Sequence, residues 1–186
     1  MVAQGNRGKG GWGSFHNKKI NFEVMATSTL ESTVKAEWGE AKGFYWNDFL
    51  EEVGNHLAKE KGEDEEDVID ALCGLIKYKV KKLEHLQNIS DNKKEFKTDL
   101  SAEGIPKAIC DLLFEKYVVE ATVLEAIGKH AFLKEVKGLI DEEMPSLKKQ
   151  EVFVGLFGLM KYPATTKVQL QNISDDKKEF RDTLTA

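Results

Sequence analysis

The sequence has few of the residues that define specialised classes of protein. It contains two cysteines and three prolines among 186 residues, which excludes a disulfide-stapled scaffold and a proline-rich linker. No apolar run approaches the ~18–20 residues of a membrane-spanning helix, so we expect no membrane span. Cys73 and Cys110 both lie among apolar residues, as buried thiols do in a reducing compartment. We therefore predict a cytoplasmic protein.

The short motifs that carry common chemistries are also missing. The sequence contains no Gly-x-Ser-x-Gly elbow, no Walker-type glycine loop, no HExxH pair and no GxGxxG after a strand. Its four histidines have no paired metal-ligand spacing, and none is next to a cysteine. We therefore predict that the chain is not an enzyme and binds no cofactor or metal.

Charge is distributed unevenly along the chain. The net charge is −5. Residues 1–24 carry a net charge of +3, from Arg7, Lys9, Lys18, Lys19 and Glu23, so the remainder carries −8. An acidic body offers no electrostatic footprint for duplex nucleic acid. The glycine-rich residues 1–18 cannot bury enough apolar surface to order themselves, so we expect a flexible leader. The alternative, which the sequence supports less well, is that their basic side chains contact RNA.

The most informative feature is an eleven-residue stretch that occurs twice. Residues 86–96 read LQNISDNKKEF, and residues 170–180 read LQNISDDKKEF. A shift of 84 gives 18 identities over the 35 positions 68–102 without a gap. We predict a tandem duplication: a leader at 1–18, a first copy at 19–102 and a second copy at 103–186.

Apolar periodicity predicts helices throughout both copies. We expect a short helix at 27–38, a helix from Phe44 to about Glu60 that is stopped by Gly62, and a longer one from Val68 through Leu86. In the second copy Pro163 should end the equivalent helix near Lys161. The expected fold is all-α with about eight helices, four per copy, forming one compact domain or a short helical-repeat array.

The repeated stretch predicts a further short helix in each copy. Ser90 and Ser174 are the expected N-caps, and Phe96 and Phe180 should both point inward. The β-branched residues at 117–123 would suit a strand, but no partner strand is evident, so a break in the helix or its continuation is preferred there.

Polar identity within the repeated stretch suggests a contact made twice. Packing requires its apolar residues but not its polar ones, which are Gln87, Asn88, Lys93, Lys94 and Glu95 in the first copy and Gln171, Asn172, Lys177, Lys178 and Glu179 in the second. They are our candidate contact residues, either between the copies or with a partner. The alternative is that recent common descent alone keeps them alike.

A second candidate surface is the aromatic run Phe44, Tyr45 and Trp46. Three adjacent positions on a helix cannot all face one core, so Phe44 and Tyr45 are candidate partner contacts. The alternative is that Trp46 joins the core while Phe44 and Tyr45 close the preceding loop.

Together these features predict a non-enzymatic intracellular protein-interaction or structural-subunit module. Its partner would be another protein or a second copy of the chain. The competing hypothesis is a helical carrier that binds a small apolar ligand between the two copies.

Overall fold

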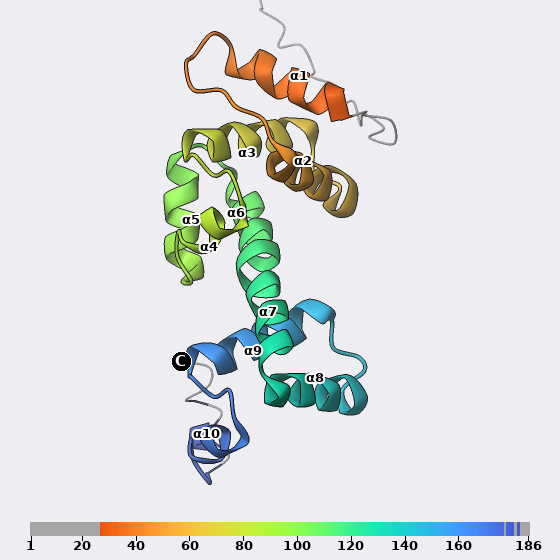
Figure 1. Cartoon of the computed structure of the whole chain (residues 1–186), viewed down its shortest axis with the longest axis vertical. Helices are drawn as coiled ribbons and strands as arrows, with labels where there is room; N and C mark the ends of the chain where they lie inside the picture. Colours follow the sequence, from red (N-terminus) through yellow and green to blue (C-terminus); the bar gives the residue numbers. More distant parts are fainter. Residues whose placement is uncertain (1–26, 177, 181, 183–186) are drawn as a thin grey trace, which may run out of the picture.

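The computed structural model describes residues 27–176, 178–180 and 182, and that part of the chain contains helices and no strand (Figure 1). The all-α prediction is confirmed. The α-helices are α1 (Thr27–Trp38), α2 (Asp48–Asn55), α3 (Glu65–Lys77), α4 (Leu83–Gln87), α5 (Lys93–Ala102), α6 (Lys107–Leu113), α7 (Ala121–Lys129), α8 (Ala131–Glu143), α9 (Lys149–Lys161) and α10 (Lys167–Gln171). Two π-helical segments, η2 (His56–Lys61) and η3 (Phe114–Glu120), continue α2 and α6.

One uninterrupted run of helix joins the two halves of the molecule. It consists of α6, η3 and α7, covers residues 107–129, and is called the connecting helix below. Figure 1 shows it running down the middle of the molecule, with α2–α5 around its upper part, α1 above α2 and α3, and α8 and α9 around its lower part. The preference for helix over strand at 117–123 is therefore confirmed.

The larger part of the hydrophobic core lies in the first half. There α1 packs on α2 and α3, while α4 and α5 pack on α6 and η3. The buried side chains of this region include Val34, Leu50, Leu57, Leu72, Leu75, Leu86, Phe96, Leu100, Ile109 and Leu113. The connecting helix lies within the predicted second copy, yet it packs on α3, α4 and α5 of the first.

The second half packs less completely. Helices α8 and α9 pack on each other and on α7, and α9 also packs on η3. The buried apolar side chains of α8 and α9 are Leu133, Val152, Phe153 and Leu156. Large apolar side chains at Leu139, Met144, Val154 and Val168 are more than half exposed.

Helix bounds repeat with the spacing of the sequence repeat. Helices α3 and α9 differ by 84 residues at both ends, and so do α4 and α10. The start of α8 lies 83 residues after the start of α2. The duplication and the boundary at 102/103 stay predictions, but the two copies build matching helices at matching places.

One predicted helix was wrong. The expected helix through Leu86 ends at Lys77, and α4 begins only at Leu83. Lys79 has a left-handed φ of 62°, and the Val80 N–H donates to the Leu75 carbonyl at 2.9 Å, which turns the chain away from the helix axis. Helix α9 ends at Lys161 as predicted, so the expected difference in helix length between the copies does not exist.

The helix starts also differ from prediction. Helix α2 begins at Asp48 rather than Phe44, because the Asn47 side chain caps it by accepting from the Leu50 N–H at 3.0 Å. Asn92, not Ser90, caps α5 by accepting from the N–H groups of Lys94 and Glu95. Asp176, not Ser174, accepts from the equivalent N–H groups in the second copy.

The number of helices is higher than predicted, with ten α-helices among the described residues rather than about eight. The breaks after Lys77 and Lys161 and the separate α6–η3–α7 segments account for the difference. The predicted stop at Gly62 is confirmed, because this glycine ends η2 with a left-handed φ of 69°.

Candidate functional site

Two of the repeated polar residues in the first copy contact the connecting helix. Gln87 Nε2 donates to Thr122 Oγ1 at 3.3 Å. Lys93 Nζ lies 3.2 Å from a carboxylate oxygen of Glu115 and 3.5 Å from one of Asp111. In the first copy, this part of the repeated stretch therefore makes an internal contact.

The other repeated polar residues lie at the surface or serve the helix start. Asn88 and Lys94 are exposed. Glu95 accepts from the Ser90 hydroxyl at 3.0 Å, and Glu179 accepts from the Ser174 hydroxyl at 2.8 Å. These paired hydrogen bonds show that the described parts of the two stretches have the same local conformation.

In the second copy the candidate residues face solvent. Gln171, Asn172, Lys178 and Glu179 are exposed, whereas Lys177 lies outside the described residues. Gln87 and Lys93 of the first copy contact the connecting helix, whereas no described helix packs on the equivalent surface of the second copy.

An ion-pair cluster reinforces the first-copy contact. Asp111 pairs with Lys97 and Lys93. The side chains of Asp111 and Lys97 are each 32% exposed, and that of Lys93 is 49% exposed. Burial alone would raise the pKa of Asp111, but the hydrogen bond from Lys97 and the charges of both lysines outweigh it and hold this pKa below its usual value. The carboxylate therefore stays ionised and binds α5 to α6.

Apolar contacts complete the same interface. The Phe96 and Phe114 rings meet edge to face, with centroids 5.3 Å apart. A Cβ added at Gly74 would lie 2.3 Å from Ile105 Cγ1. Only glycine at this position of α3 therefore lets the segment before α6, which contains Ile105, approach so closely. We call Gly74, Gln87, Lys93, Phe96 and Lys97 the docking set of the first copy.

Every member of the docking set has a matching residue 84 positions later. Gly74, Gln87, Lys93 and Phe96 recur as the same residue types, and Lys97 is replaced by another basic residue, Arg181. Lys177 and Arg181 lie outside the described residues. The sequence of the second copy therefore keeps the chemistry of a surface that the first copy uses to bind a helix.

The corresponding surface of the second copy is open. Its residues are Gly158, Leu159, Leu170, Gln171 and Phe180, which we call the acceptor face. Gln171 is exposed and the other four are half-buried. Their first-copy counterparts Gly74, Leu75, Leu86 and Phe96 are all buried. Phe180 is therefore less buried than Phe96, and no helix in the described part of the chain packs over it.

The aromatic run holds the segment between α1 and α2 against the core. Phe44, Tyr45 and Trp46 are all half-buried and lie before α2 begins. The Tyr45 hydroxyl donates to the Val80 carbonyl at 2.8 Å, and burial raises the pKa of this phenol to about 12. Phe44 lies 6.4 Å from Trp38, ring centre to ring centre. A role of Phe44 and Tyr45 in binding a partner stays a prediction.

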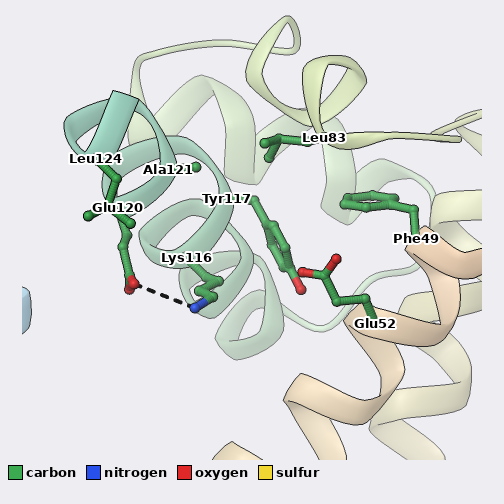
Figure 2. Close-up of a pocket in the computed structure, with 8 residues that line it drawn as sticks. All are labelled: Phe49, Glu52, Leu83, Lys116, Tyr117, Glu120, Ala121 and Leu124. Carbon is green, nitrogen blue, oxygen red and sulfur yellow. Dashed lines mark hydrogen bonds and ion pairs between the residues drawn. The ribbon is translucent and has the colours of Figure 1, made fainter. Parts of the chain in front are cut away.

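Figure 2 shows a cavity where the first copy meets the connecting helix. Its volume is about 150 Å³, and it is lined by Phe49, Glu52, Leu83, Lys116, Tyr117, Glu120, Ala121 and Leu124. The Tyr117 ring lies across the cavity beside Phe49, with its hydroxyl directed toward the Glu52 carboxylate. The volume is small compared with the ~300–1,000 Å³ of typical ligand pockets.

A second cavity, of about 320 Å³, has a charged lining that includes Lys61, Glu115, Lys148 and Lys149. Burial would raise the pKa of the neighbouring Glu120, but the hydrogen bond from Lys149 and the charge of Lys116 lower it overall. Glu120 pairs with Lys116 and Lys149, and Glu115 pairs with Lys93. A lining with this many charged side chains does not suit an apolar ligand.

Both cysteines are buried free thiols, and burial raises the pKa of each, which keeps them protonated. Within the described ranges no cluster of histidine, cysteine and carboxylate side chains is placed to hold a metal ion. None of the helices described is both long and apolar enough to cross a bilayer.

Comparison with known proteins finds no matching family model, no matching curated protein and no matching solved structure. The candidate site therefore has to be recognised from the chain's own repeat. Our reading of the sequence missed Gly74 and Lys97 as contact residues. A signal for them was present, because Gly74 is identical to Gly158 and a basic residue stands at both Lys97 and Arg181.

Proposed function

We propose that this chain is a non-enzymatic protein-interaction or structural-subunit module, and that the acceptor face is its binding surface. The observation that carries the proposal is unequal burial of matching residues. Phe96 is fully buried whereas Phe180 is half-buried, and Leu86 is fully buried whereas Leu170 is half-buried. Apolar surface that one copy removes from water stays partly in water in the other, and covering it would be favourable by about 25 cal/mol per Å².

Polar residues at the edge of the acceptor face support the same proposal. Gln171 stands where Gln87 donates a hydrogen bond to the connecting helix, and it is exposed. A partly apolar centre with hydrogen-bonding groups at its edge is the usual composition of a protein interface.

The carrier hypothesis has less support. The cavity in Figure 2 is small and is lined in part by Glu52 and Glu120, and charged side chains line much of the larger cavity. An apolar ligand would leave those charges in a dry environment, which is unfavourable.

Capture experiments with matched baits test the proposal. The full chain is used as bait against an extract of its native source, beside Gln171→Arg and Leu170→Asp on the acceptor face. Val154→Asp is the control: Val154 is more than half exposed on α9, and its first-copy counterpart Asp70 is exposed as well. Circular dichroism checks that all four baits fold.

We expect the wild-type chain and Val154→Asp to retain the same proteins, further copies of this chain included, and both acceptor-face variants to lose them. Equal capture by all four baits would refute the acceptor face as the binding surface.

A further inference from the structure

The structure shows which helix occupies the docking set of the first copy. Ile105, Asp111, Phe114 and Glu115, which contact it, all lie in or just before α6 and η3. This helix continues into α7, which packs on α8 and α9 of the second copy. One continuous helix therefore uses its first half to cover one copy and its second half to begin the next.

Helix α1 occupies the same place in the first copy as α7 does in the second. It packs on α2 and α3, the helices that match α8 and α9. At a shift of 89, Leu30-Glu-Ser-Thr-Val34 aligns with Val119-Glu-Ala-Thr-Val123, and three of the five positions are identical. Leu30 and Val34 are buried, as are Val119 and Val123. Helix α1 is thus the counterpart of the second half of the connecting helix.

The residues before α1 then correspond to the half of the connecting helix that covers the first copy. At the same shift, Ile20, Val24 and Met25 match Ile109, Leu113 and Phe114. The three matching residues in the connecting helix are buried. Residues 18–26 lie outside the described part of the chain, so this correspondence is one of sequence. They nevertheless carry apolar side chains at the spacing that the docking set accepts.

We propose that a second copy of this chain binds the acceptor face through its residues 18–26, extending the repeat head to tail. The proposal rests on the proposed function and names its partner. It joins two molecules rather than one to itself, because α1 and α10 lie at opposite ends of the long axis (Figure 1). The donor and acceptor surfaces differ, so each added copy leaves one of each free, and assembly continues as an open chain.

The contact between molecules should be weaker than the contact within one. Asp111 and Glu115, which pair with Lys93 and Lys97, correspond at this shift to Phe22 and Ala26. The intermolecular contact therefore keeps the apolar residues and lacks the ion pairs. We expect reversible assembly that depends on protein concentration.

Sedimentation equilibrium of the full chain over a range of concentrations tests the proposal. The average mass of the wild-type protein should rise above the 21.0 kDa of one chain as concentration increases. Val24→Asp, which removes the donor, and Gln171→Arg or Leu170→Asp, which alter the acceptor, should each stay at the mass of one chain. Val154→Asp should behave as the wild type does.

Mixing the variants makes the test specific. Val24→Asp keeps its acceptor face and Gln171→Arg keeps its donor segment, so an equal mixture should form dimers and stop there. A wild-type protein that stays monomeric up to its solubility limit would overturn the proposal. So would a mixture that stays monomeric, or an acceptor variant that dimerises by itself, since that would indicate a symmetric contact.

Failure of the head-to-tail assembly can be told apart from failure of the acceptor face as a binding surface. If the bait captures other proteins through the acceptor face while the pure chain stays monomeric, the interaction module stands and the second copy is refuted as its partner. If acceptor-face variants change neither capture nor mass, both proposals are refuted.

Discussion

The two copies share a sequence signature but differ in what covers it. In the first copy, α5 lies against α6, and Phe96 is fully buried. In the second, no described helix packs over the same stretch, and Phe180 is half-buried. Burial at these positions therefore depends on whether another helix packs against them. A repeated motif indicates what a surface can bind, and its neighbour determines whether the surface is already occupied.

The phenylalanine pair should give the largest difference between the copies. Phe96→Ala removes a fully buried ring that packs on Phe114 and should lower the free energy of unfolding by ~3–5 kcal/mol. Phe180→Ala should cost less than about half of that, because a half-buried ring loses less contact. Urea unfolding of both variants at a concentration where the chain is monomeric checks this. Equal losses would contradict the difference in burial.

A glycine substitution tests how closely α3 approaches the segment that enters the connecting helix. A methyl group at Gly74 would lie 2.3 Å from Ile105 Cγ1 and 3.3 Å from the Glu103 carbonyl oxygen. Gly74→Ala should therefore destabilise the protein by about 1–3 kcal/mol through overpacking, although alanine favours helix more than glycine does. Thermal unfolding measures the change, and a rise in melting temperature would show that the two segments separate easily.

Acid should weaken the first-copy interface through Asp111. Its pKa is lowered in the folded protein, so its ion pairs stabilise the fold above the ordinary carboxyl pKa of about 3.9 and are lost as pH falls through the lower folded value. Asp111→Asn should cost about 1 kcal/mol or less near pH 7, since the pair is partly exposed.

The difference between Asp111→Asn and wild type should shrink as the pH falls through the lowered folded pKa of Asp111 and disappear once this carboxyl group is protonated. Unfolding free energies of the two proteins across this pH range provide the measurement. A difference that persists unchanged in acid would show that the carboxylate acts through its shape rather than its charge.

The smallest expected effect lies on α9. Gly155 stands where the first copy has the buried Ala71, and a Cβ at Gly155 meets nothing within 4 Å. Gly155→Ala should therefore stabilise the protein by about 0.5–1 kcal/mol, because it lowers the entropy of the unfolded chain without a clash. A melting temperature that stays the same or falls would mean that α9 contributes little to global unfolding.

Much of the fold was predictable because local signals agreed with one another. The bounds of α1, the stop at Gly62 and the helix at 117–123 all followed from period, glycine position and the absence of a partner strand. The break after Lys77 did not, because Lys79 adopts a left-handed conformation that lysine rarely favours and sits among good helix formers. The second copy holds the missing signal, since Pro163 occupies the position of Lys79.

The candidate site was predictable only in part. Comparing the copies identified Gln87 and Lys93 as residues kept for a contact, and the structure places both beside the connecting helix. Which residues they meet could not be read from the repeat, because Thr122 and Glu115 belong to a helix whose path depends on tertiary packing. The N-caps were misassigned because Ser90, Asp91 and Asn92 are all good capping residues, and only the backbone geometry selects among them.

Residues 107–129 pack on helices of both halves of the molecule, so the stability of each half depends on the other. Unfolding of α8 and α9 would expose one end of the connecting helix and weaken its packing on α3–α5, and unfolding of α3–α5 would have the same effect on α8 and α9. Heating should therefore produce a single cooperative transition. A fragment cut at residue 102 should collapse into a loose, protease-sensitive state, since it would lack the ring of Phe114 and the side chain of Ile105 that close its interior.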